Sequence, residues 1–191
     1  MNLDEIISSI KQFKNHKSVL IAIEGYGGSG KSTVAEKLKQ QLTSAEIIKI
    51  DSFIVKQKAR DAEPWEEVFD RERLKEQILE PQALGNPIIY QRLDWEKNKL
   101  GVNITLPKAD YLIIDGIASY HPDIEAYYDF KIWVDTPIDV AKKRGKSRDS
   151  NNENVVMWEK WAQCDLAYQQ KYHPELRADF IVNNEKGKVG I

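Results

Sequence analysis

The sequence has a single cysteine and no long apolar run. One thiol, Cys164, cannot form an internal disulfide, which is consistent with a reducing compartment. No stretch approaches the ~18–20 apolar residues that a membrane span requires. Charged residues also interrupt positions 1–15, which argues against the apolar core of a secretory signal. We therefore expect a cytoplasmic protein without a membrane partner.

The chain also lacks an excess of positive charge. Its formal net charge is -2, whereas proteins that bind duplex nucleic acid normally present a basic face. Hydrophobic residues make up 41% of the chain, enough for an ordinary globular core. A length of 191 residues suits one domain rather than two. We expect a single domain over residues 1–191 and no nucleic-acid partner.

Short apolar runs alternate with stretches of helical pattern. The runs are apolar at nearly every position, which is typical of parallel strands covered on both faces. We therefore predict an α/β fold, a doubly wound five-stranded parallel sheet with helices on both faces. Ligands of such sheets collect at the carboxyl ends of the strands. The predicted strands are residues 18–24, 46–51, 111–115, 131–135 and 179–182.

Residues 52–107 interrupt this alternation as an insertion. Its first part, 52–83, is charged and largely helical in pattern. Two short extended segments follow at 88–90 and 102–106, separated by a polar turn. We predict that these two segments form a small hairpin that projects over the site.

Residues 25–32 (GYGGSGKS) match the P-loop motif G-x-x-x-x-G-K-[ST] completely. Glycines allow the backbone to turn its N–H groups toward phosphate oxygens, and the following helix adds a positive dipole end. Lys31 would reach the β- and γ-phosphates, and the Ser32 hydroxyl would ligate Mg²⁺. The motif lies between a predicted strand and a predicted helix over 33–42, as the chemistry requires. The predicted ATP-binding residues are Gly25, Gly27, Gly28, Ser29, Gly30, Lys31, Ser32 and Thr33.

Two aspartates at predicted strand ends complete the expected phosphate site. Asp115 ends the run YLIID, where P-loop enzymes place an acidic residue that helps to hold magnesium. Asp51 ends the preceding strand, from which a carboxylate could accept the proton of a hydroxyl that attacks the γ-phosphate. Asp115 could instead be a solvated strand end, and Asp51 could be a helix cap or a partner in a loop salt bridge.

A polar stretch over residues 142–154 contains further cations. It follows a helix that we expect to begin at Thr136 and Pro137, a favourable N-cap and N1 pair. The guanidinium groups of Arg144 and Arg148 match phosphate geometry, which favours a catalytic role. The alternative is a solvated basic helix end, which the helix dipole favours.

The runs IEGYGGSGKST, IKIDSF, YLIIDG and KIWVDTPIDVAKKRGKSRD occur in the same order as in uridine kinases. Over about residues 18–182 the chain resembles the group of uridine kinases, phosphoribulokinase-like and pantothenate-kinase-like enzymes. It is most similar to the short bacterial uridine-kinase-like proteins, whose Y-x-R-x-D-W segment corresponds to residues 90–95. The resemblance implies a P-loop kinase that uses ATP and Mg²⁺, and it allows a homo-oligomer.

The resemblance also implies roles for individual residues. Asp51 would be the base that orients the acceptor 5′-hydroxyl. Arg144 and Arg148 would lie on a mobile lid, about residues 142–154, and clamp the phosphates during transfer. The substrate-binding set would be Asp51, Phe53, Phe69, Asp70, Tyr90, Arg92, Asp94 and Trp95.

Three functions therefore stay open. The first is transfer of the γ-phosphate to the 5′-hydroxyl of a uridine- or cytidine-like nucleoside, although Ile54 and Asn98 stand where uridine kinases commonly have tyrosine and histidine. The second is a kinase for another alcohol, such as a pantothenate-, sugar- or sugar-phosphate-like acceptor. The third is a nucleotide-dependent switch, which the lack of an N-K-x-D guanine-recognition element disfavours. A phosphorylated acceptor would require cations from the insertion: Lys56, Lys58, Arg60, Arg71, Arg73 and Arg92.

Overall fold

A five-stranded parallel sheet forms the centre of the computed structural model, which describes residues 2–13, 18–94 and 96–186. The strand order is β2-β5-β1-β6-β7, with every neighbouring pair parallel. This arrangement confirms the predicted doubly wound α/β fold. The strands are β1 (Val19–Glu24), β2 (Ala45–Lys49), β5 (Tyr111–Asp115), β6 (Phe130–Asp135) and β7 (Phe180–Asn183).

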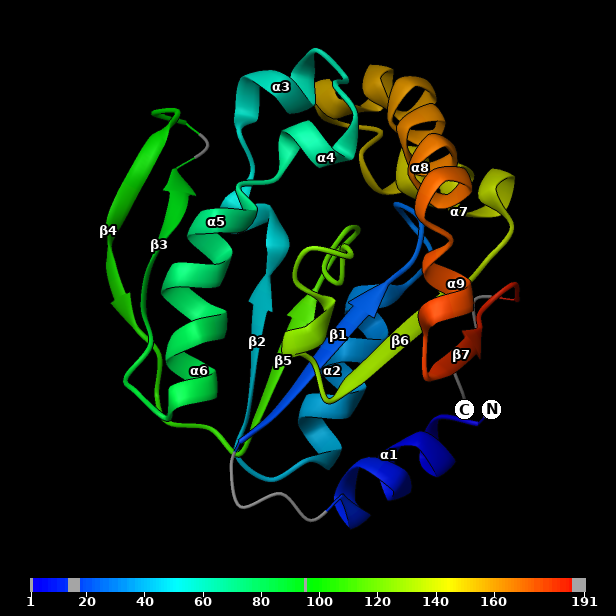
Figure 1. Cartoon of the computed structure of the whole chain (residues 1–191). Coiled ribbons are helices and arrows are strands. Elements are labelled where there is room, and N and C mark those ends of the chain that lie inside the picture. Colours follow the sequence, from blue (N-terminus) through cyan, green and yellow to red (C-terminus); the bar gives the residue numbers. More distant parts are fainter. Residues whose placement is uncertain (1, 14–17, 95, 187–191) are drawn as a thin grey trace.

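Helices pack on both faces of the sheet (Figure 1). On one face α1 (Leu3–Gln12) and α2 (Lys31–Gln41) cover the odd-numbered side chains of β1, including Ile21 and Ile23. The opposite face of β1, with Leu20 and Ala22, packs into a second core. Because both faces are covered, the strand sequences are apolar throughout rather than alternating.

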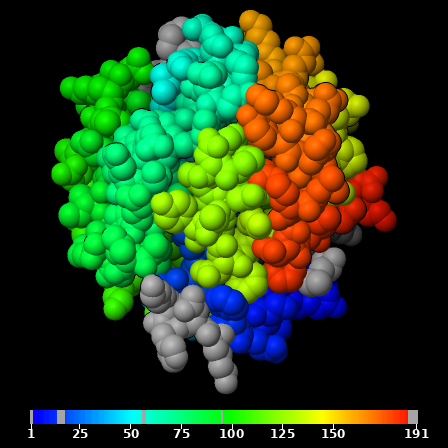
Figure 2. All heavy atoms as spheres, in the orientation of Figure 1, coloured from blue at the N-terminus to red at the C-terminus, as the bar shows by residue number. Residues whose placement is uncertain are grey.

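The second core is covered by α8 (Trp158–Tyr172), by the insertion and by the segment that follows β5. In the space-filling view, the segment 116–128 (yellow-green) lies between the insertion (cyan to green) and the C-terminal helices (orange to red), as Figure 2 shows. This segment contains the 3-10 turn η3 (Glu125–Tyr127), and α9 (Pro174–Arg177) follows α8.

The insertion is helical and ends in an antiparallel hairpin, as predicted, but the hairpin strands are longer than the predicted 88–90 and 102–106. The hairpin pairs β3 with β4, with a register shift between Gln91 and Leu93. Among the described residues of the hairpin, Glu96 lines the cavity at the carboxyl ends of the parallel strands. Figure 1 shows the hairpin beside α5 and α6, at the edge of the molecule. The elements are η1 (Ile50–Phe53), α3 (Lys56–Arg60), α4 (Trp65–Val68), α5 (Arg71–Leu74), η2 (Lys75–Leu79), α6 (Glu80–Leu84), β3 (Ile89–Asp94) and β4 (Lys99–Thr105).

Two predicted boundaries next to the cavity are wrong. The second strand ends at Lys49, and Asp51 lies in the 3-10 turn η1, which buries both Ile50 and Phe53. The helix α7 (Ile138–Arg148) begins after Pro137, so Thr136 is not its N-cap. Thr136 is buried instead, and its hydroxyl donates to the carbonyl oxygen of Ser29 at 3.1 Å.

Residues 142–154, predicted as a lid, comprise the end of α7, a turn and the start of the 3-10 turn η4 (Glu153–Met157). Closure of this segment over a nucleotide stays a prediction. Among the described residues, no helix has the length and apolar character needed to cross a bilayer.

Candidate active site

The phosphate-binding loop joins β1 to α2. It requires glycine where φ is positive and where another backbone approaches too closely for a Cβ atom. Gly28 and Gly30 have φ values of +80° and +102°, in the left-handed region that favours glycine. A Cβ atom on Gly28 would lie 2.2 Å from the carbonyl oxygen of Ala141, so α7 closes against the loop backbone. A cavity of about 1220 Å³ at the carboxyl ends of the strands is lined by Gly27, Gly28, Gly30, Lys31, Ser32 and Thr33, whereas Gly25 and Ser29 of the predicted ATP-binding set are not among its lining residues.

Lys31 is positioned by the loop itself. Its ammonium donates to the carbonyl oxygens of Gly25 and Tyr26, both at 2.8 Å. Desolvation lowers the pKa of Lys31, and the negative charges of Asp115, Asp165 and Asp51 oppose that shift. The ammonium therefore lies within the field of three carboxylates that face the same cavity.

Ser32 and Asp115 form the candidate magnesium site. The Ser32 hydroxyl donates to Oδ2 of the buried Asp115 at 2.7 Å, across the junction of α2 and β5. The other oxygen, Oδ1, has no hydrogen-bond partner among the described residues. A hydroxyl beside a buried carboxylate with an unpartnered oxygen fits a hard divalent cation. The ammonium of Lys49 lies 3.1 Å from both Ser32 Oγ and Asp115 Oδ2.

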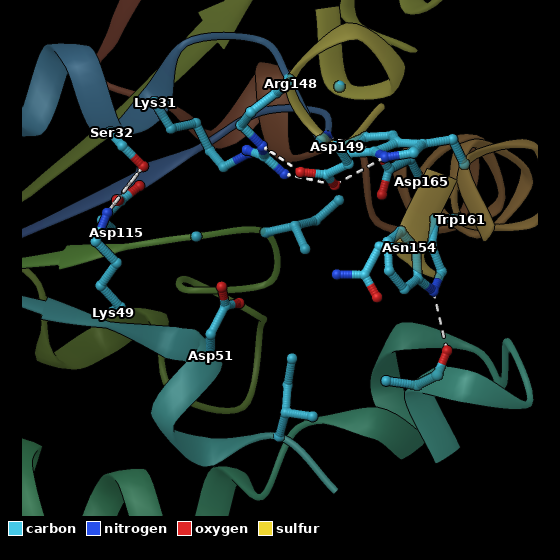
Figure 3. A pocket seen from close by; sticks show the side chains of 18 of the residues that line it. Lys31, Ser32, Lys49, Asp51, Asp115, Arg148, Asp149, Asn154, Trp161 and Asp165 are labelled. Carbon is cyan, nitrogen blue, oxygen red and sulfur yellow. Dashed lines mark hydrogen bonds and ion pairs between the residues drawn. The ribbon is translucent and has the colours of Figure 1, made fainter. Parts of the chain in front are cut away.

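Asp51 reaches the cavity from η1, two residues beyond the end of β2. Its carboxylate points into the cavity (Figure 3). Although the side chain contacts cavity solvent, the surrounding protein desolvates it and raises its pKa. Lys31 opposes this shift most strongly, and Lys49 and Arg148 also lower the pKa. The carboxylate thus lies between the cations Lys31, Lys49 and Arg148 and the insertion.

Arg148 is oriented by its neighbour and by an indole ring. Its guanidinium donates to Asp149 from Nε at 3.0 Å and from Nη2 at 3.2 Å. It also lies 5.4 Å from the ring centroid of Trp158, whose Nε1 donates to the same Asp149 carboxylate. The other predicted clamp, Arg144, lines the cavity while it donates to the carbonyl oxygens of Asn184 and Glu185. Its phosphate contact stays a prediction.

The opposite wall of the cavity is largely apolar. It comes from η1, α3, α4 and α8, and from the start of the 116–128 segment. Arg60 adds one cation there, paired with Glu153 of η4. The apolar members of this acceptor wall are Ile54, Ala59, Trp65, Phe69, Ile117 and Trp161.

Asp165 connects the acceptor wall to the phosphate loop. Its Oδ2 accepts from the N–H of Gly27 at 2.7 Å, and its Oδ1 accepts from the indole N–H of Trp65 at 2.7 Å. Complete burial raises the pKa of Asp165 to about 6, although Lys31 and the Gly27 N–H lower it. One carboxylate therefore holds the P-loop, α8 and α4 together.

The predicted substrate-binding residues separate in the structure. Asp51 and Phe69 line the cavity. Phe53 and Tyr90 are buried and stack on each other with ring centroids 6.2 Å apart, and the hydroxyl of Tyr90 accepts from Arg92 at 3.2 Å.

The other predicted acceptor residues have local structural partners. Asp70 caps α5 by accepting from the Arg73 N–H, and Asp94 accepts two N–H groups in the hairpin turn. Trp95 lies outside the described residues. Acceptor binding by these residues stays a prediction, as it does for the residues that line the cavity.

Sequence reasoning missed Lys49, Asp165 and Glu24. Asp165 interrupts the apolar stripe of α8 between Trp161 and Tyr168, and a carboxylate on such a stripe was an available signal. Glu24 ends an otherwise apolar strand directly before the P-loop. Lys49 has no such signal, because a lysine at a strand end is ordinarily solvated.

Comparison with known proteins identifies the chain. Residues 20–154 match the Phosphoribulokinase / Uridine kinase family. The chain belongs to this family. It is therefore a kinase, a phosphotransferase with an alcohol group as acceptor, and the resemblance seen in the sequence is confirmed.

Relatives extend the match along most of the chain. Uridine kinase from Enterobacter sp. (strain 638) is 28% identical over 185 residues, which cover 84% of this chain and 80% of the relative. Uridine kinase from Clostridium botulinum (strain Okra / Type B1) is 32% identical over 153 residues, covering 71% and 70%.

Two solved structures share the fold. A possible uridine kinase from Bacillus stearothermophilus superposes with a TM-score of 0.69 at 21% identity, covering 94% of this chain and 96% of that one. A putative fructose transport system kinase from Silicibacter sp. TM1040 gives 0.70 at 22%, covering 95% and 98%. At this level of identity the similarity establishes the fold and not the acceptor.

Proposed function

We propose that this kinase transfers the γ-phosphate of ATP, bound with Mg²⁺, to the 5′-hydroxyl of a nucleoside. The observation that carries the proposal is the position of Asp51. Its carboxylate lies in the field of Lys31, Asp115, Lys49 and Arg148, in the cavity that the acceptor wall closes. The names of the curated relatives, uridine kinases, support the nucleoside acceptor.

The residues divide the chemistry of in-line phosphoryl transfer among them. Asp51 would accept a hydrogen bond from the acceptor hydroxyl and take its proton as the oxygen attacks phosphorus. Lys31 and Arg148 would stabilise the negative charge of the transferring group. Ser32 and Asp115 would hold magnesium, which when bound neutralises phosphate charge. Trp158 and Asp149, which orient Arg148, would pre-position that cation.

The charge of the acceptor wall favours a neutral acceptor over a sugar phosphate. Among the insertion cations whose side chains the structure describes, Arg60 alone lines the cavity, and Glu153 neutralises it. Four other cations that a phosphorylated acceptor would require have anionic or oxygen partners elsewhere: Lys58 with Glu67, Arg71 with Asp123, Arg73 with Asp70, and Arg92 with the Tyr90 hydroxyl. A phosphorylated acceptor would therefore find little unpaired positive charge there.

Ile54 suggests how a base would be held. It lines the cavity and forms a β-bridge with Phe69, so the pair presents an apolar surface. A nucleobase would pack against this surface and the Trp161 indole rather than bond to a tyrosine hydroxyl at position 54.

The test measures ADP formation from ATP and Mg²⁺ in the presence of each candidate acceptor: nucleosides, pantothenate, sugars and sugar phosphates. Mass spectrometry identifies the products. We expect uridine or cytidine to stimulate turnover. Lys31→Ala should lower turnover at least about 10³-fold, and Asp51→Asn about 10²–10⁴-fold in kcat. Lys39→Ala is the matched control, because Lys39 on the same helix pairs with Glu46 instead.

Each outcome decides one part of the proposal. Stimulation by none of the nucleosides would refute the nucleoside acceptor, and stimulation by a sugar or pantothenate would identify the second candidate class. Full turnover in Asp51→Asn would remove Asp51 as the base. A homo-oligomer and the lack of a nucleic-acid partner stay predictions.

A further inference from the structure

Lys49 makes contacts that the chemistry of the site assigns to a metal ion. It ends β2, directly opposite Asp115 in the register of the sheet. Its ammonium lies 3.1 Å from Asp115 Oδ2 and 3.1 Å from Ser32 Oγ, while Ser32 donates to the same Oδ2 at 2.7 Å. Figure 3 shows the three side chains gathered at one end of the cavity.

A lysine and a magnesium ion cannot make the same contacts together. Magnesium binds oxygen ligands at about 2.0–2.1 Å, so an ammonium on the same oxygens would lie within a few ångströms of a dication. Their repulsion would be strong because Asp115 is buried, which weakens solvent screening. Lys49 can move away, since its side chain is 51% exposed and its stem is flexible.

We propose that the Lys49 ammonium competes with the divalent cation for Ser32 and Asp115, and so selects metal bound to nucleotide over free metal. In the protein without nucleotide, Lys49 neutralises Asp115 and keeps the affinity for free divalent ions low. The phosphates of the nucleotide supply the extra negative charge that lets the metal displace the ammonium. Metal thus enters together with the nucleotide. This inference rests on the magnesium site of the proposed function and assigns the regulation of that site.

Binding of Mn²⁺ to the nucleotide-free protein, followed by electron paramagnetic resonance, tests the competition directly. Removing one positive charge beside the site should tighten Mn²⁺ binding about tenfold in Lys49→Gln. Lys49→Arg keeps the charge and should bind as the wild type does. Lys39→Gln is the matched control, because it neutralises a lysine that pairs with Glu46 outside the cavity. The double variant Lys49→Gln/Asp115→Asn should lose the gain.

Thermal unfolding gives a second readout that needs no turnover. In EDTA, Lys49→Gln leaves the Asp115 carboxylate without its ammonium, so its Tm should fall below that of the wild type. Added Mn²⁺ should raise the Tm of Lys49→Gln more than that of the wild type or of Lys39→Gln. If Lys49→Gln does not fold, Lys49→Met and Lys49→Ala extend the neutral series, and a failure of every neutral variant even with Mn²⁺ would overturn the inference.

Equal or weaker Mn²⁺ binding by Lys49→Gln would overturn the competition, whatever the acceptor is. Tighter binding together with no phosphorylation of any nucleoside would refute the proposed acceptor and leave the inference standing. The two proposals therefore fail through different measurements.

Discussion

The phosphate side and the acceptor side of the cavity are built in different ways. On the phosphate side, six residues of one continuous stretch, 27–33, line the cavity, and Asp115 joins them from the neighbouring strand. On the acceptor side, the bond between Trp65 and Asp165 joins residues 100 positions apart. The indole N–H of Trp161 donates a hydrogen bond to the carbonyl oxygen of Ala59, 102 positions away.

The phosphate side depends mainly on backbone conformation, and the acceptor side depends mainly on side-chain packing. The P-loop depends on φ values and on close backbone approach, which a short motif encodes by itself. The acceptor wall depends on how helices of the insertion pack against α8. We infer that substitutions in the loop affect every substrate alike, whereas substitutions in the wall affect stability and acceptor choice in small steps.

The largest effect should come from Gly28→Ala, which tests the backbone side. The new Cβ would lie 2.2 Å from the carbonyl oxygen of Ala141 at a φ of +80°. We expect ADP affinity, measured by calorimetry, to fall at least about 10³-fold, or about 4 kcal/mol. Gly85→Ala is the matched control, because Gly85 has a φ of +71° with no atom within 4 Å of the added Cβ. It should cost about 1 kcal/mol of stability and leave ADP affinity unchanged. Unchanged ADP affinity in Gly28→Ala, with a stability loss no larger than that of Gly85→Ala, would show that the close approach of α7 does not restrict the loop.

Glu24 lies beneath the loop and should make stability depend on pH. Desolvation raises its pKa to about 8, opposed by the Tyr120 N–H, Arg177 and Lys31. Folding favours the protonated form of Glu24. The contribution of this carboxyl to stability is therefore full below its ordinary pKa of 4.5 and is lost as pH rises through about 8. Glu24→Gln should therefore gain stability relative to the wild type as pH rises, by about 4 kcal/mol at pH 8.

Urea unfolding between pH 5 and pH 9 measures the Glu24 effect. Parallel pH profiles of the two proteins would contradict it. In that case protonation of Glu24 would contribute nothing to the free energy of unfolding.

Trp65→Phe tests the link between the two sides. The variant leaves Oδ1 of Asp165 buried without the indole N–H, while the bond from Gly27 to Oδ2 remains. We expect a loss of about 1–2 kcal/mol in the free energy of unfolding and less than about a threefold change in ADP affinity. Trp161→Phe, which loses a partly buried hydrogen bond to the neutral carbonyl of Ala59, should cost less. A tenfold loss of ADP affinity in Trp65→Phe would show that the acceptor wall controls the loop.

The smallest effect should come from the ion pair between Arg60 and Glu153. Both side chains are substantially exposed, at 46% and 70%. A double-mutant cycle with alanine should give a coupling energy below about 0.5 kcal/mol. A coupling above about 1 kcal/mol would mean that this pair, rather than the apolar wall, holds α3 to η4.

The phosphate side could be predicted from the sequence because its determinants are local. The five strands were visible as apolar runs, and the P-loop as a motif in its required context. Asp115 followed from its position at a strand end. Asp51 was placed one element too early, since the 3-10 turn that buries Ile50 and Phe53 leaves no signal in the apolar pattern.

The acceptor side could be predicted only in outline. A helical insertion with a hairpin was expected, but the cavity positions were not. Phe53 and Tyr90 stack inside the core, while Ile54 and Trp161 line the cavity. A position on an amphipathic helix or strand shows that a side chain is covered, and not which distant element covers it.

The sequence by itself determined the parallel sheet, the phosphate loop and the kinase family. Periodicity and glycine positions act over a few residues, so they can be read along the chain. Only the tertiary structure decided which polar groups meet. Asp165 reaches the N–H of Gly27 across 138 positions, and Lys49 reaches Asp115 across 66. Such contacts depend on strand register and helix packing, because the energy of a buried charge is set by the partners that folding brings to it.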